Sequence, residues 1–132
     1  MREGGFTLVE VMISMLILTT GMLAVAGLLA VTTQMQVGAR EAARSMRLAH
    51  EKIDELMKED FATSVLIAVG GSLTSDAANH FETAPGGLDG ITLRWSVAAG
   101  PIANTRVLMV RVVNLRAQQY RNTDVSTIIR DE

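Results

Sequence analysis

The pattern of hydrophobic and polar positions changes twice along the chain. From Val11 to Ala39 there are 29 consecutive residues without a charge. Residues 40–60 then hold 11 charged residues and neither glycine nor proline, a composition typical of an exposed helix. From Phe61 onward, glycines, prolines and strand-like runs appear. We therefore expect an apolar helix that continues as an amphipathic helix, followed by a region of loops and strands.

The amphipathic part is predicted from a stripe of apolar residues with 4-3-4-3 spacing. The stripe consists of Met35, Ala39, Ala42, Met46, Ala49, Ile53 and Leu56. This spacing places all of them on one helix face, which must pack against another element. No proline precedes Pro85, so the apolar and amphipathic parts are expected to form one helix from Phe6 to Lys58. At 1.5 Å per residue it would be about 80 Å long and would have to protrude from so small a domain.

The C-terminal part predicts a small antiparallel sheet. Residues 91–97 alternate apolar and polar side chains, which is the period of a half-buried strand. Residues 98–105 contain turn residues, and the runs 107–115 and 124–130 are rich in valine or isoleucine. A three-stranded meander would cover the helix stripe, with Ile53 and Leu56 beneath the sheet that includes Trp95. The predicted class is α+β, a long protruding N-terminal helix packed on a small antiparallel sheet. Residues 59–90 are expected to form a connecting loop with one short element.

Composition excludes several functional classes. The 132 residues are 48% hydrophobic and 20% charged with a formal net charge of -2, so neither a disordered chain nor a basic nucleic-acid binder is indicated. The chain has no cysteine and only two histidines, which excludes disulfides, thiolate metal sites and histidine-rich metal sites. No nucleophile–base pair or phosphate-binding glycine loop is present. We therefore expect no enzyme activity and no cofactor.

The N-terminal apolar segment has two ordinary interpretations. A secretory signal peptide could be cleaved after the small residues Ala24-Val25-Ala26, leaving a periplasmic binding protein that starts near Gly27. Against this, Arg2 is offset by Glu3, and the uncharged run continues beyond the cleavage site. A simple uncleaved anchor fits the length, since about 20 apolar residues span a bilayer. It does not explain Glu10, because a carboxylate in an apolar segment is costly.

A third interpretation accounts for Glu10. The segment Gly4-Gly5-Phe6-Thr7-Leu8-Val9-Glu10, followed at once by the apolar run, resembles the class III signal of type IV prepilins and pseudopilins. The resemblance implies cleavage between Gly5 and Phe6 by a prepilin peptidase and methylation of the new amine of Phe6. It also implies a leader at residues 1–5, a transmembrane and filament-core helix at 6–34, and a globular domain at 35–132. That domain would comprise the helix 35–58, the loop 59–90 and the sheet 91–130.

In this interpretation, Glu10 has a role in assembly. Its carboxylate would pair with the Phe6 ammonium of a neighbouring subunit in an apolar filament core, where an unpaired charge would cost several kcal/mol. The partners would be other pilin subunits through the N-terminal helix, the prepilin peptidase and the inner membrane. The chain would be a single-pass bacterial inner-membrane protein before assembly and would lie at the cell surface, in the pilus, afterwards.

Further residues resemble one group within the family. The run from Ile17 to Leu28, together with Ala43, Leu48-Ala49, Glu51 and Leu56, is similar to the minor pilins called PilV. Major pilins usually carry a proline in this helix and a C-terminal cysteine pair, and this chain has neither. The resemblance implies a structural subunit for filament initiation and assembly. The alternative is a minor pseudopilin of the I type from a type II secretion system.

Two further groups of residues have more than one interpretation. His80 with Asp76, Asn79, Glu82 and Asp89 could bind calcium through oxygen ligands, although their spacing matches no EF-hand and a solvated polar loop is the simpler interpretation. His50 is expected to be exposed or at a sheet edge. Six arginines of the sheet region form the other group. They could lie on solvated strand faces and protect the sheet edges, could form charge-complementary contacts with other subunits, or could contact DNA at a pilus tip. We favour solvation and edge protection. The six are Arg94, Arg106, Arg111, Arg116, Arg121 and Arg130.

Overall fold

The computed structural model describes residues 5–117 and 121–131. It contains the helix α1 (Leu8–Leu56) and five strands. The strands are β1 (Gly70–Gly71), β2 (Phe81–Thr83), β3 (Ile91–Ala99), β4 (Thr105–Asn114) and β5 (Asn122–Arg130), with a short 3₁₀ turn at Pro85–Gly87. The chain divides into two compact units, one ending at Val37 and the other beginning at Gly38, and α1 contributes to both.

The first unit is helical, and every described residue in it is solvent-exposed. Its side-chain hydroxyls donate hydrogen bonds back to helix carbonyls four residues earlier. Examples are Ser14 to Glu10 at 2.7 Å and Thr32 to Leu28 at 2.8 Å, and Thr19, Thr20 and Thr33 do the same. These bonds give each of these five hydroxyls a partner within the helix, so the hydroxyl side chains of the apolar run need no water.

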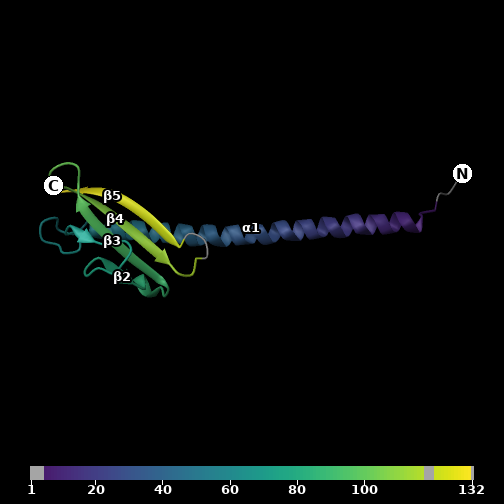
Figure 1. Ribbon diagram of the computed structural model, residues 1–132, viewed down its shortest axis with the longest axis horizontal. Helices are drawn as coiled ribbons and strands as arrows, with labels where there is room; N and C mark the ends of the chain where they lie inside the picture. The colour runs from purple at the N-terminus through teal and green to yellow at the C-terminus, as the bar shows by residue number, and fades with distance from the viewer. Residues whose placement is uncertain (1–4, 118–120, 132) are drawn as a thin grey trace. The chain divides into compact units, whose positions relative to one another are not determined.

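The second unit contains an antiparallel sheet in the order β1-β3-β4-β5, with β2 also pairing with β3 (Figure 1). β3 and β4 pair in unbroken register from Ile91↔Asn114 to Ala99↔Arg106, and β4 and β5 pair from Thr105↔Arg130 to Val113↔Asn122. β1 and β2 occupy successive parts of the other edge of β3. The predicted meander is therefore confirmed, and two short strands extend it.

The core lies between the sheet and the part of α1 that follows Gly38. Alternate side chains of β3 and β4 are buried, because successive residues of a strand point to opposite faces. Ile53 and Leu56 of α1 are buried with Trp95, as predicted. The predicted α+β class, with a long helix packed on an antiparallel sheet, is confirmed. The core residues are Ala49, Ile53, Leu56, Ile67, Ile91, Leu93, Trp95, Val97, Leu108, Val110, Val112 and Ile129.

The predicted helix stripe was wrong at three positions. Met35, Ala39 and Met46 are exposed, whereas Ser45 and Lys52, which lie outside the stripe, are buried. The buried face is therefore rotated relative to the apolar stripe. A helix buries whichever side chains point at the sheet, and Lys52 is tolerated because two carboxylates and an aromatic ring compensate its charge.

Residues 59–90 contain more structure than the single short element predicted. Trp95 Nε1 donates to the Leu66 carbonyl at 2.8 Å, and Arg106 donates to the carbonyls of Phe61 and Ile67 at 2.7 and 2.9 Å. At Gly71, φ is +84° and a Cβ atom would lie 2.3 Å from the Trp95 carbonyl oxygen, so only glycine fits. Side-chain hydrogen bonds thus hold this segment to the sheet. The hydrophobic periodicity of the sequence does not predict them.

Candidate processing and assembly site

Thr7 begins α1 by capping it. The Glu10 amide lies 3.3 Å from Thr7 Oγ1, and the Thr7 carbonyl accepts the amides of Glu10 and Val11 at 3.1 and 3.2 Å. A threonine followed three residues later by a glutamate is the capping-box signature. Our sequence interpretation did not assign Thr7 this role, although the spacing was available. The cap fixes the helix start directly after Gly5 and Phe6.

Gly5 and Phe6 lie ahead of the helix and outside any helix or strand. The Phe6 side chain is 79% exposed. A Cβ atom added at Gly5 would meet no described atom within 4 Å. The fold of the described chain therefore gives no reason for glycine at position 5, and an accessible peptide bond follows it. Such a bond is suited to recognition by another protein.

Glu10 lies in the first turn of α1. A carboxylate at this position is favoured by the partial positive charge of the helix N-terminus. Its side chain is exposed, and no described residue forms an ion pair or hydrogen bond with its carboxylate. Glu10 is thus available to a cation from outside the chain. Glu10 follows Phe6 by four residues in the sequence.

The surface that follows Glu10 is continuously apolar. α1 includes an 18-residue stretch of mean hydropathy 2.2, none of it buried, which is long and apolar enough to cross a membrane. Gly21 leaves a shallow depression on this surface, and a Cβ atom there would meet nothing within 4 Å. Since no described residue covers this surface, its apolar residues require either lipid or other helices. The depression is lined by Ile17, Leu18, Gly21, Met22, Val25, Ala26 and Leu29.

The residues considered for calcium binding do not converge. Asp76 accepts from Arg94 Nε at 2.8 Å, whereas Glu82 accepts from Lys52 Nζ at 2.9 Å. The described residues contain no group of three or more metal-binding side chains. His80 is buried, with Nδ1 3.0 Å from the Ala78 carbonyl and Nε2 3.1 Å from the Ala68 carbonyl. The expectation of a solvated loop is therefore wrong for His80. Its buried ring lies between the segment that contains Ala68 and the segment that contains Ala78.

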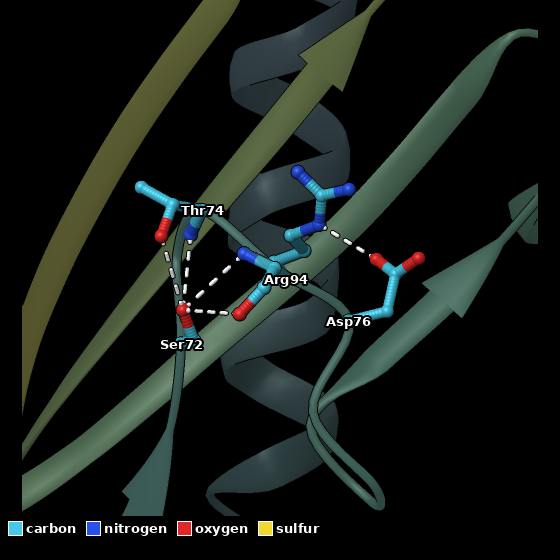
Figure 2. A network of polar contacts seen from close by, with 5 residues as sticks. Ser72, Thr74, Asp76 and Arg94 are labelled. Carbon is cyan, nitrogen blue, oxygen red and sulfur yellow. Dashed lines mark hydrogen bonds and ion pairs between the residues drawn. The ribbon is translucent and has the colours of Figure 1, made fainter.

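The Asp76–Arg94 pair belongs to a polar loop packed beside β3 (Figure 2). Ser72 Oγ accepts the amides of Thr74 and Ser75, each at 3.2 Å. The hydroxyl of Ser75 also donates to Ser72 Oγ at 3.0 Å. These bonds close a serine turn, and the ion pair ties the turn to the sheet. The network therefore satisfies its own polar atoms.

Three of the six sheet arginines have partners within the chain. Arg94 pairs with Asp76, and Arg111 forms two bonds with Asp124, 2.7 Å from Nε and 2.6 Å from Nη2. The guanidinium of Arg106 lies 4.0 Å from the Phe61 ring centroid while donating to two carbonyls. For these three, the structure favours an intramolecular role. His50 is exposed, as expected.

Comparison with known families supports the N-terminal interpretation. Residues 1–26 match the prokaryotic N-terminal methylation motif. A search of curated proteins and a search of solved structures each gave no match. The chain therefore carries an N-methylation motif of the kind found at the N-terminus of type IV pilins and pseudopilins, and it has a pilin-like α+β fold. The motif belongs to structural proteins rather than enzymes, and it implies processing by a prepilin peptidase and assembly with pilins.

Proposed function

We propose that this protein is a minor pilin of the PilV kind, a structural subunit that helps to initiate and assemble a type IV pilus. The observation that carries the proposal is the match of residues 1–26 to the methylation motif, in a chain whose apolar helix surface is covered by no described residue. A segment of this kind can serve first as a membrane anchor and later as a filament core. The globular region would then present its surface to the other subunits.

Processing would divide the chain at Gly5. Residues 1–5 would be the leader, residues 6–34 the membrane and filament-core helix, and residues 35–132 the globular domain. Cleavage would create an ammonium group on Phe6, which would then be methylated. The exposed position of Phe6 and the open space around Gly5 support this proposal. Before assembly the protein would be a single-pass inner-membrane protein, and afterwards it would be exposed on the pilus.

Glu10 would set the register of assembly. Its carboxylate would bind the Phe6 ammonium of an adjacent subunit, since no described residue of its own chain pairs with it. In the apolar filament interior such a pair compensates two charges that would each be costly alone. Helices shifted by one turn would leave both charges unpaired. The pair therefore selects one arrangement of neighbouring helices.

A minor rather than a major pilin is favoured by two features. α1 is unbroken by proline, and the chain has no cysteine pair. The second candidate is a minor pseudopilin of the I type, which shares the N-terminal motif. Isolation of sheared surface filaments tests the choice: a minor pilin should be recovered with them. Recovery only with a secretion complex, together with loss of secretion on deletion, would favour the pseudopilin.

The processing step is tested by mass spectrometry of the N-terminal peptide from membranes and filaments. We expect a peptide that begins with N-methylated Phe6. Gly5→Leu should leave the full-length precursor in the membrane, because the peptidase needs close backbone approach at the residue before the cut. Gly21→Leu is the matched control, since position 21 is equally open and lies away from the cut. Maturation of Gly5→Leu at Phe6 would contradict the proposal.

A further inference from the structure

Asn114 joins α1 to the connection between β4 and β5. It is fully buried, and its Nδ2 donates to Glu41 Oε2 on α1 at 2.9 Å. Its Oδ1 accepts the Arg116 amide at 3.0 Å, and its own amide donates to the Arg121 carbonyl at 2.7 Å. Residues 116 and 121 are therefore held beside the part of α1 that surrounds Glu41.

Four exposed arginines lie at this end of the second unit, which we call the basic end. They are Arg40 and Arg44 of α1 and Arg116 and Arg121 of the β4–β5 connection. No described carboxylate forms an ion pair with any of the four. Of the carboxylates nearby, Glu41 is bonded to Asn114, and Asp89 adjoins Gly90, whose carbonyl accepts the Leu115 amide. The arginines outnumber these two acids, so this end carries net positive charge.

The opposite end of the unit is acidic. β4 ends with Asn114 at the basic end and begins at the opposite end, where β5 finishes (Figure 1). A hollow at this opposite end is lined by three carboxylates, those of Glu59, Asp60 and Asp131, and by one base, Arg130. The charges of the unit are therefore separated along the sheet, and the basic end is the one at which α1 enters the unit.

The length of the uncharged run relates the basic end to a bilayer. The 29 residues from Val11 to Ala39 belong to α1 and are about 43 Å long as a helix. A bilayer that includes both headgroup layers is about 40–45 Å thick. When this run spans the bilayer, Glu10 lies at one surface and Arg40 at the other. Helical side chains lean toward the N-terminal end of their helix, so Arg40 and Arg44 lean toward the headgroups.

The orientation of the span does not account for these arginines. Bases beside a membrane span are most abundant on the cytoplasmic side, where they set the orientation. The proposed function puts the second unit on the outer side of the inner membrane, because the unit later becomes part of an external filament. The segment on the cytoplasmic side, residues 1–10, has one arginine and two glutamates. The arginines of the basic end therefore need another explanation.

We propose that the basic end binds the phosphate groups of anionic phospholipids in the outer leaflet of the inner membrane before assembly. This inference rests on the proposed function, which supplies the membrane stage and the orientation. Each arginine near an anionic lipid surface strengthens binding about fivefold. A guanidinium also matches a phosphate group with two parallel N–H donors.

A second copy of this chain is a poorer partner for the basic end at this stage. Anchored in the same bilayer, it would hold its own basic end at the same level, because its uncharged run has the same length. The carboxylates of Glu59, Asp60 and Asp131 would lie at the opposite end of its second unit. The arginines of two copies would thus face one another, whereas anionic headgroups lie at the level of the arginines of every copy.

The test is native mass spectrometry of the uncleaved full-length chain in a non-ionic detergent. The chain is titrated with phosphatidylglycerol, which is anionic, or with phosphatidylcholine, which is zwitterionic. Arg116→Gln with Arg121→Gln removes two charges that lie far from the apolar run in the sequence. We expect this pair to lower the affinity for phosphatidylglycerol about 25-fold and to leave that for phosphatidylcholine unchanged. Lys58→Gln with Arg130→Gln is the matched control, since it removes two exposed bases outside the basic end and should change neither affinity.

Two further variants separate charge from packing. Residues 116 and 121 bond to Asn114 through backbone atoms, so substitution of their side chains retains these bonds. Arg116→Lys with Arg121→Lys keeps both charges and should retain most of the preference for phosphatidylglycerol. Arg40→Gln with Arg44→Gln should lower the preference as the first pair does.

Several outcomes would overturn the inference. They are equal binding of the two lipids by the wild type, an equal loss in the control pair, and no loss in Arg116→Gln with Arg121→Gln. Unchanged lipid binding together with reduced incorporation into filaments would assign these arginines to an acidic surface of another subunit instead. Failure of cleavage at Gly5 would contradict the proposed function and would not affect a titration of the uncleaved chain, so the two failures are distinguishable.

Discussion

Lys52 is the residue where burial and charge conflict most directly. Its Nζ lies 2.9 Å from Glu82, 3.0 Å from Glu55 and 4.9 Å from the Trp95 ring centroid. Burial by itself would lower the pKa of Lys52, but the hydrogen bonds from Glu82 and Glu55 outweigh it and raise the pKa above the ordinary 10.5. The ammonium therefore joins β2, which carries Glu82, to the helix.

Two substitutions of Lys52 should distinguish the contribution of its packed side-chain stem to stability from the contribution of its charge. Lys52→Met keeps most of the buried stem and should cost about 1 kcal/mol, whereas Lys52→Ala should cost about 2–3 kcal/mol, because stem packing and the cation–π contact are lost as well. The raised pKa means that the contribution is complete below about pH 10.5 and is lost as pH rises through the folded-state value. Unfolding of the full chain in detergent, followed from pH 7 to 11, measures both effects. An alkaline loss that is equal in the wild type and Lys52→Met would contradict this account.

Asp124 gives the opposite pH dependence. Its hydrogen bonds from Arg111 lower the pKa of its carboxyl. Stability from the pair is therefore present above the ordinary pKa of 3.8 and is lost as pH falls through the lowered value. Because the Asp124 side chain is 42% exposed, Asp124→Asn should cost less than about 1 kcal/mol at pH 7. Denaturation series at pH 7 and pH 2 should show this difference disappearing in acid, and a constant difference would exclude the linkage.

At the scale of elements, the packing of α1 on the sheet depends on which face is buried. Ile53 lies in the core, whereas Met46 and Arg47 are exposed. Ile53→Ala should lower the free energy of unfolding by about 2–5 kcal/mol, the usual cost of truncating a buried aliphatic side chain. Met46→Ala and Arg47→Ala should each change it by less than about 1 kcal/mol, because neither side chain is buried.

Met46→Ala is the decisive control in this series. The apolar spacing alone places Met46 on the same stripe as Ile53, but the structure leaves it 45% exposed. Chemical denaturation of the three variants in detergent compares them directly. A loss for Met46→Ala similar to that for Ile53→Ala would show that the helix face is the one expected from spacing.

At the scale of the whole molecule, substitution of Glu10 tests the proposed role of this residue in assembly. Glu10→Ala should ease membrane insertion, since a charge is removed from an apolar segment. Cleavage after Gly5 should be preserved, because Glu10 lies several residues beyond the cut. Incorporation into filaments should fall, since the neighbour's Phe6 ammonium would be buried without a partner, at a cost of about 3–5 kcal/mol. A subunit at the filament tip, with no neighbour beyond it, would show a smaller effect.

The assay is the amount of processed protein in sheared filaments relative to the membrane fraction. Thr7→Ala serves as a comparison, because it removes the helix cap while retaining the carboxylate, and should cost only about 1 kcal/mol of helix stability. Normal incorporation of Glu10→Ala, with normal filament numbers, would show that Glu10 does not set the register. A defect equal to that of Thr7→Ala would assign the effect to the helix start instead.

The sequence by itself determined the features that depend on neighbouring residues in the chain. The uncharged run, the charged helix after it and the alternation from Ile91 to Val97 are local patterns, so α1 and the three long strands could be predicted. The N-terminal motif is also local, which is why Gly5, Phe6 and Glu10 could be identified as a group. Their roles in cleavage, methylation and assembly remain predictions.

Tertiary structure decided what depends on contacts between distant residues. Ser45 and Lys52 are buried while Met46 is not, because the sheet selects one helix face, and Lys52 meets Glu82 thirty residues away. The buried His80 ring lies between the carbonyls of Ala68 and Ala78, since β1 and β2 draw the loop onto β3. The open edge of β5 likewise appears only when strand order is known. The periodicity of a sequence shows which residues share one face of a helix or strand. Only the packing of the elements determines which helix face is buried and which sheet edges stay unpaired.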